Sequence, residues 1–308
     1  GLSSKWAFLA YLFAFFGMIG GLPAVQSNQM VQIISEFALP ILSFDNQLIF
    51  NMICGLIIAV LAGTVIIGGL TRIAKASSWL VPIMGGLYVL TATFILIANF
   101  EDVPSVIKII FSDAFTGTSV AGGTLMGVIM YGIQRGAFSN EAGIGTEALI
   151  HGTAKTNNPI KQGFVAMIGP IFDTLLICTA TAVVIILSGL WMGDQYSGVS
   201  LTAMAFQTFL GSAGIAVVFL CVVFFGISTI FTYSYYGSVC ARFLFGPKGQ
   251  RVYLYIFIAT IIFFASISLD SAINIIDGSF AMMAIPTLIS SIILAPKVIA
   301  EANKFLAR

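Results

Sequence analysis

Hydroxyl groups gather in one apolar segment of the chain, residues 228–237 (Ser-Thr-Ile-Phe-Thr-Tyr-Ser-Tyr-Tyr-Gly). In a helix Thr229 and Tyr233 are four residues apart and share one face, which Ser228 adjoins. Hydroxyl oxygens suit a hard cation, and an aromatic ring beside them can form a wall for a small zwitterion. The alternative is that the hydroxyls bond back to backbone carbonyls one turn earlier and that the tyrosines lie at a membrane interface.

Side-chain amides and one carboxyl interrupt two other apolar segments. Gln26, Asn28, Gln29 and Gln32 cannot all face lipid, because an unpaired polar group is costly at membrane depth. They predict either the lining of a cavity or hydrogen bonds between helices. Asp173 predicts ion coordination or a gating hydrogen bond, or else a carboxylate satisfied by nearby helix ends or an arginine.

Two glycine-containing stretches also carry polar groups. Residues 116–124 (Thr-Gly-Thr-Ser-Val-Ala-Gly-Gly-Thr) favour a broken helix whose free amides and carbonyls face a substrate or Na⁺, or else close packing through small residues. Residues 134–146 place Arg, Ser, Asn and Glu among three glycines. They predict a solvated turn or an ordered cytoplasmic gate with an internal Arg135–Glu141 pair.

The elements that position these groups are membrane helices. The 308 residues are 59% hydrophobic and 8% charged, whereas soluble domains carry about 25% charged residues. A bilayer core of about 30 Å requires about 20 apolar residues per helix, and eight stretches qualify. They are 6–34, 48–68, 79–99, 118–134, 160–189, 212–244, 252–268 and 271–296. Residues 101–116 are too short and charged to span and predict a surface helix.

The loop charges give an orientation. If the N-terminus is cytoplasmic and the spans alternate, every Lys and Arg of the 13 falls on the cytoplasmic side except Lys108. The positive-inside rule therefore predicts both ends in the cytoplasm. The same alternation places Arg135 inside and Asp277 outside. A net charge of +1 indicates no affinity for nucleic acid, and a single histidine, His151, excludes multi-histidine metal sites.

Several strings in order resemble the alanine/glycine:cation symporters, the sodium:alanine symporter family. Residues 135–143 (Arg-Gly-Ala-Phe-Ser-Asn-Glu-Ala-Gly) look like its signature, and residues 155–163 (Lys-Thr-Asn-Asn-Pro-Ile-Lys-Gln-Gly) continue it. Further matching strings are 172–174, 178–181, 228–230, 234–237, 268–270 and 284–286.

The resemblance implies an all-α membrane protein with the inverted-repeat leucine-transporter fold, in which the first helix of each five-helix repeat is broken. The eight spans then correspond to core helices three to ten. Residues 1–117 hold the last three helices of the first repeat plus the surface helix, and residues 118–308 hold the complete second repeat. The family's Gly-Thr-Gly-Asn break does not occur in the sequence, so the first two core helices are expected to precede residue 1.

The resemblance also implies a sodium-coupled symporter of a small neutral amino acid such as alanine or glycine, in the cell (inner) membrane, with Na⁺ as coupling ion and no cofactor. The expected Na⁺ ligands are Ser228, Thr229 and carbonyls near Phe225. The expected amino-acid site lies between the helix break and the hydroxyl face, with Gln26 approaching from the first span. Its residues are Gln26, Val120, Ala121, Gly122, Gly123, Thr229 and Tyr233.

Departures from the family pattern concern the pocket. The family usually has Trp at the position of Tyr233 and Gly at that of Thr232, and it commonly has Gly-Gly-Phe-Ala-Gly at residues 118–122. Tyr233 leaves room for a substrate slightly larger than alanine. The alternatives are a truncated or degenerate protein without transport and a cation channel, although no repeated filter loop or ring of acids is visible. The sequence shows no catalytic constellation, so we do not expect an enzyme.

Overall fold

The computed structural model describes residues 2–42, 45–115, 125–193 and 195–307, and within them all regular structure is helical. The first half of the chain contains η1 (Ser4–Trp6), α1 (Ala7–Gly20), α2 (Ala24–Leu42), α3 (Gln47–Ile66), α4 (Leu70–Ala98) and α5 (Val103–Phe115). The remainder contains α6 (Leu125–Asn140), α7 (Thr146–His151), α8 (Pro159–Pro170), η3 (Ile171–Cys178), α9 (Thr179–Ser188), η4 (Leu190–Met192), α10 (Val199–Leu210), α11 (Ser212–Phe264) and α12 (Leu269–Leu306).

Six helical stretches in the described residues are long and apolar enough to cross a membrane, which makes the chain an integral membrane protein. They are Ser4–Leu39, Gln47–Ile66, Leu70–Ala98, Pro159–Ser188, Ser212–Phe264 and Leu269–Leu306. The hydropathy pattern predicts eight. One of those eight, 212–244, lies within α11, and another, 252–268, overlaps the end of the same helix. The one at 118–134 begins outside the described residues and continues into the 16-residue α6. The number of spans counted from continuous apolar helices in the described residues is therefore smaller than the number predicted from hydropathy along the sequence.

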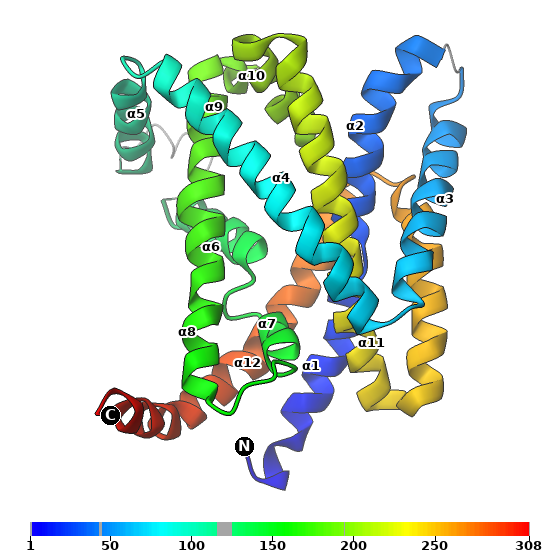
Figure 1. Ribbon diagram of the computed structural model, residues 1–308, viewed down its shortest axis with the longest axis vertical. Coiled ribbons are helices and arrows are strands. Elements are labelled where there is room, and N and C mark those ends of the chain that lie inside the picture. The colour runs from blue at the N-terminus through cyan, green and yellow to red at the C-terminus, as the bar shows by residue number, and fades with distance from the viewer. Residues whose placement is uncertain (1, 43–44, 116–124, 194, 308) are drawn as a thin grey trace.

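The 53-residue α11 consists of two arms joined at Gly246. Gly246 has φ 71° and ψ −170°, a conformation that residues with a Cβ avoid, and Pro247 lacks the N–H needed to continue the helix. The chain reverses there, and the second arm runs back beside α3 (Figure 1). Ile58 of α3 and Phe257 and Ile261 of this arm belong to one buried apolar cluster.

The first expected span is two helices rather than one, because α1 ends at Gly20 and α2 begins at Ala24 after a proline. The Tyr253 hydroxyl donates a 2.8 Å hydrogen bond to the carbonyl of Met18, which satisfies an acceptor near the end of α1. Beyond the break, Met30 of α2 lies in the same buried cluster as Ile230 of α11. The break therefore leaves α2 packed along the first arm of α11.

Residues 159–188 form one continuous stretch with an irregular centre. Asn158 caps it by accepting hydrogen bonds from Ile160 N (3.0 Å) and Lys161 N (3.2 Å), and Pro159 occupies the first turn. The centre is the π-helical turn η3, which contains Asp173. Wide turns of this kind in α-helices are frequent at functional sites.

The two chain ends lie at the same end of the molecule. In Figure 1 the N- and C-termini are both at the lower end, together with the reversal in α11, whereas α5 and α10 are at the upper end. The expected surface helix at 101–116 is α5, and most of its residues are exposed.

Candidate functional site

A cavity of about 420 Å³ lies between α2 and the first arm of α11. The α11 residues that line it include all the predicted site residues of that helix: Phe225, Ser228, Thr229 and Tyr233, together with Thr232. Gln26, Gln29 and Met30 line it from α2, and Val81 and Met84 line it from α4. The structure thus brings Gln26 together with hydroxyl-bearing residues about 200 positions away.

On the α11 wall, the Ser228 hydroxyl donates a 2.9 Å hydrogen bond to the carbonyl of Phe225. The Thr232 hydroxyl donates to the carbonyl of Ser228 at 3.1 Å. Hydrogen bonds of this kind, to carbonyls about one turn earlier, were predicted as the alternative to hydroxyls that face a cation. They also place hydroxyl and carbonyl oxygens side by side at the cavity.

The polar side chains of α2 divide into two groups. Gln26 and Gln29 line the cavity. Asn28 instead donates a 2.7 Å hydrogen bond to the carbonyl of Ile267, and Gln32 donates a 2.7 Å bond to Ser200 on α10. Cavity lining and hydrogen bonding between helices were predicted as alternatives, and both occur, on different faces of one helix.

Gln29 belongs to both groups. Its amide oxygen accepts a 2.9 Å hydrogen bond from Val199 N, the first residue of α10, while its side chain lines the cavity. Gly198 precedes Val199 with φ +59°, and a Cβ there would lie 2.7 Å from the Gln29 oxygen. Both the positive φ and this contact favour glycine at position 198, where Gln29 connects the cavity to α10.

The last turn of α6 and the residue after it supply cavity residues that were not predicted from the sequence. Phe138, Ser139 and Glu141 all line the cavity. Glu141 has φ 56°, the only positive φ of a non-glycine residue in the described part of the chain. Burial raises the pKa of its carboxyl, which lies outside the spanning helices. The polar string 134–146 was the available signal, but it does not show which group turns inward.

Asp173 lies behind the cavity rather than in it. Its carboxylate accepts a 2.6 Å hydrogen bond from Ser139, a cavity residue, and Thr174 next to it accepts one of 2.9 Å from Asn140. The hydroxyl that binds Asp173 therefore comes from the last turn of α6, a neighbouring helix end, and not from an arginine.

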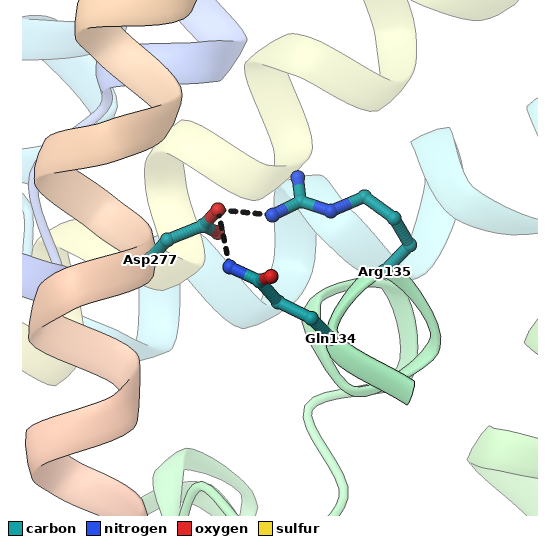
Figure 2. A network of polar contacts seen from close by, with 3 residues as sticks. All are labelled: Gln134, Arg135 and Asp277. Atoms are coloured by element: carbon teal, nitrogen blue, oxygen red, sulfur yellow. Dashed lines mark hydrogen bonds and ion pairs between the residues drawn. The ribbon is translucent and has the colours of Figure 1, made fainter. Parts of the chain in front are cut away.

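The predicted Arg135–Glu141 pair is wrong. Arg135 forms an ion pair with Asp277 of α12, and Gln134 donates a 2.8 Å hydrogen bond to the same carboxylate oxygen (Figure 2). The guanidinium also lies 5.4 Å from the ring centroid of Phe138. The contact contradicts the placement of Arg135 and Asp277 on opposite sides of the membrane. The described helix α6 has only 16 residues, which is shorter than a full membrane span. Counting alternating spans therefore does not show at which depth Arg135 lies.

The predicted substrate residues Val120, Ala121, Gly122 and Gly123 lie outside the described residues. A larger cavity, of about 670 Å³, lies between η1, α1, α7, α11 and α12, and none of the predicted site residues that the structure describes lines it. The site that unites the described candidates is therefore the cavity between α2 and α11.

Comparison with known proteins places the chain among transporters. The family model described as the sodium:alanine symporter family matches residues 1–308. The transporter YflA of Bacillus subtilis is 38% identical over 263 residues, covering 83% of this chain and 56% of that protein. The sodium/alanine symporter AgcS of Methanococcus maripaludis is 35% identical over 305 residues, covering 96% of this chain and 65% of that protein. The probable sodium/glutamine symporter GlnT of Bacillus subtilis is 33% identical over 310 residues, covering 99% and 62%.

The match extends over the whole chain and confirms the resemblance that residues 135–143 predicted, although the chain spans only 56% to 65% of the length of these three relatives. With its apolar helices and its cavity between α2 and α11, the chain belongs to the sodium:alanine symporter family.

Proposed function

We propose that the protein is a sodium-coupled symporter of a small neutral amino acid such as alanine or glycine. The observation that carries this proposal is the single cavity that joins Gln26 with Ser228, Thr229 and Tyr233. It offers amide and hydroxyl groups to a zwitterion beside an apolar and aromatic wall. The names of AgcS and GlnT support sodium coupling, and GlnT adds glutamine as a substrate to test.

The coupling ion binds at Ser228, Thr229 and the carbonyl of Phe225. The Ser228 hydroxyl and the Phe225 carbonyl are already 2.9 Å apart, so rotation of the hydroxyl hydrogen presents two oxygens to one cation. Hard monovalent cations prefer such neutral oxygen ligands. The amino acid lies next to this site, against Thr229 and Tyr233, with Gln26 opposite.

The wider architecture that we propose is the leucine-transporter fold with eight crossings. It divides α11 at Gly246 and counts the segment at 118–134 as a span. Residues 1–117 then close the first repeat and residues 118–308 form the second. Both described chain ends face the cytoplasm, in the cell (inner) membrane, because the basic residues concentrate at that end.

Sodium supplies enough free energy for concentrative uptake without a nucleotide. One Na⁺ crossing 100 mV releases about 2.3 kcal/mol, and a tenfold gradient adds about 1.4 kcal/mol. Together they support roughly 500-fold accumulation of a neutral substrate.

The test is transport by the protein produced from its complete gene and reconstituted in liposomes. An inward Na⁺ gradient should drive uptake of labelled alanine or glycine above the external concentration, and collapse of the gradient should abolish it. Labelled glutamine serves as a larger substrate. Symport would be refuted if uptake were independent of the Na⁺ gradient, or if the protein conducted an ionic current without substrate.

A further inference from the structure

Glu141 differs from the other residues around the cavity. Among the described lining residues it alone carries a formal charge. Its left-handed backbone is a conformation that L-residues other than glycine rarely adopt. Two local hydrogen bonds hold it in place: Ile144 N donates to the Glu141 carbonyl at 3.1 Å, and Ala142 N donates to the Asn140 side chain at 2.9 Å. The loop thus bears a strained conformation that turns a carboxylate to the cavity.

Neutral hydroxyls surround this carboxylate. Thr146 at the start of α7 donates a hydrogen bond to one of its oxygens. Tyr233 and Tyr236 of α11 also interact with it, and Tyr233 interacts in turn with Gln26. The carboxyl is therefore fixed between α7 and α11, against the aromatic wall of the cavity.

No protein cation compensates the charge within the described residues. Ion pairs there join only Arg135 with Asp277 and Lys304 with Glu301. The charged groups that act on Glu141 are themselves acidic, Glu147 of α7 and Asp173 of η3. A buried carboxylate without a positive partner is unfavourable, and a cationic occupant of the cavity would stabilise it.

We propose that Glu141 binds the ammonium group of the transported amino acid. An ammonium has three donors, and an ionised carboxylate has about four acceptor sites, of which the Thr146 hydroxyl takes one. Tyr233, which touches Glu141, lies five residues beyond Ser228 on α11, about 7.5 Å along the helix axis. The ammonium site is therefore displaced from the proposed Na⁺ ligands Ser228 and Phe225. This inference rests on the proposed function and adds the group that recognises the positive end of the substrate.

The carboxylate of Glu141 could instead bind the coupling ion, which is also a monovalent cation. The experiment separates the two sources. In the protein produced from its complete gene, alanine binding at saturating Na⁺ and the Na⁺ concentration for half-maximal binding are measured for the parent, Glu141→Gln and Glu147→Gln. Glu147 is the matched control, since its carboxyl belongs to the same region but does not line the cavity.

Glu141→Gln should weaken alanine binding at least tenfold at saturating Na⁺ and leave the half-maximal Na⁺ concentration unchanged, whereas Glu147→Gln should behave as the parent. Propionate, which is alanine without its amino group, provides a second readout. The parent should prefer alanine to propionate strongly as a competitor, and Glu141→Gln should reduce that preference. A purely structural role for Glu141 would not change the ratio.

An unchanged alanine affinity with a higher Na⁺ requirement would overturn the inference by assigning Glu141 to the ion. Parent-like values for both would overturn it as well. If Glu141→Gln fails to fold, Glu141→Asp serves as a second variant, because it keeps the charge but shortens the side chain by one methylene. Glu141→Asp should still lower alanine affinity without altering the Na⁺ dependence. Parent-like alanine binding by this variant would again refute the inference. A parent that neither binds nor transports amino acids contradicts the proposed function itself, whereas Na⁺-driven uptake with no effect of Glu141 changes contradicts this inference alone.

Discussion

Ser228 tests the proposed ion site at the scale of one hydroxyl. Ser228→Ala removes the oxygen that lies 2.9 Å from the Phe225 carbonyl. The sodium concentration for half-maximal uptake should rise roughly tenfold, which corresponds to about 1.4 kcal/mol. Ser234→Ala is a matched control, because Ser234 makes the same kind of back-bond on the same helix, to Phe231 at 2.6 Å, but does not line the cavity. An equal Na⁺ requirement in both variants would contradict the assignment.

Tyr233 tests the size of the pocket. Its side chain is 4% exposed and lines the cavity. Tyr233→Trp adds volume to a packed wall, so the substrate range should narrow toward glycine and alanine. Competition of uptake by amino acids of increasing size measures this. Unaltered transport of the larger amino acids by the variant would place Tyr233 outside the pocket.

At the scale of elements, the Arg135–Asp277 pair holds α6 against α12. The two side chains are 28% and 12% exposed, and the Lys304–Glu301 pair, at 70% and 50%, is the exposed counterpart. Removing one partner of a largely buried pair leaves the other charge uncompensated, whereas an exposed pair contributes about 0–1 kcal/mol. Asp277→Asn should lower the thermal stability of the purified protein clearly more than Glu301→Gln. Equal melting temperatures would show that the ion pair does not hold the two helices together.

The contact between α10 and α2 can be tested with two glycines of similar backbone conformation. Gly198 and Gly211 have φ of +59° and +60° at the two ends of α10. A Cβ at Gly198 would meet Gln29, whereas one at Gly211 would meet nothing within 4 Å. Both alanine variants carry the same strain, so any excess effect of Gly198→Ala reports the contact with Gln29. Hydrogen exchange in α10 should increase more in Gly198→Ala than in Gly211→Ala, and equal exchange would argue against the contact.

At the scale of the whole molecule, the loop charges predict which end faces the cytoplasm. Single cysteines in place of Arg72, Lys155 and Lys248, in a background without the four native cysteines, should react with a membrane-impermeant thiol reagent only from the cytoplasmic side. A cysteine in place of Lys108 on α5 should react only from the opposite side, since Figure 1 shows α5 and the chain ends at opposite ends of the molecule. Labelling of any of the first three from outside would refute the orientation.

The sequence by itself determined the properties that depend on composition and on neighbours along the chain. A charged content of 8% requires a lipid environment, apolar stretches of spanning length predict the helices, and a spacing of four places Thr229 and Tyr233 on one face. Ordered strings such as 135–143 identified the family. Gln26, Ser228 and Thr229 could be singled out in advance because their polarity is unusual within spans, and the structure places them around one cavity.

Only the tertiary structure decided which polar groups meet. Periodicity states that two residues share a face, but not what that face packs against, because this depends on the angle and register between helices distant in sequence. Asn28 therefore ties α2 to Ile267 while Gln26 lines the cavity. Arg135 pairs with Asp277, 142 residues away, rather than with nearby Glu141. Glu141 lines the cavity from a left-handed turn after α6, and local sequence does not show that this turn meets α11.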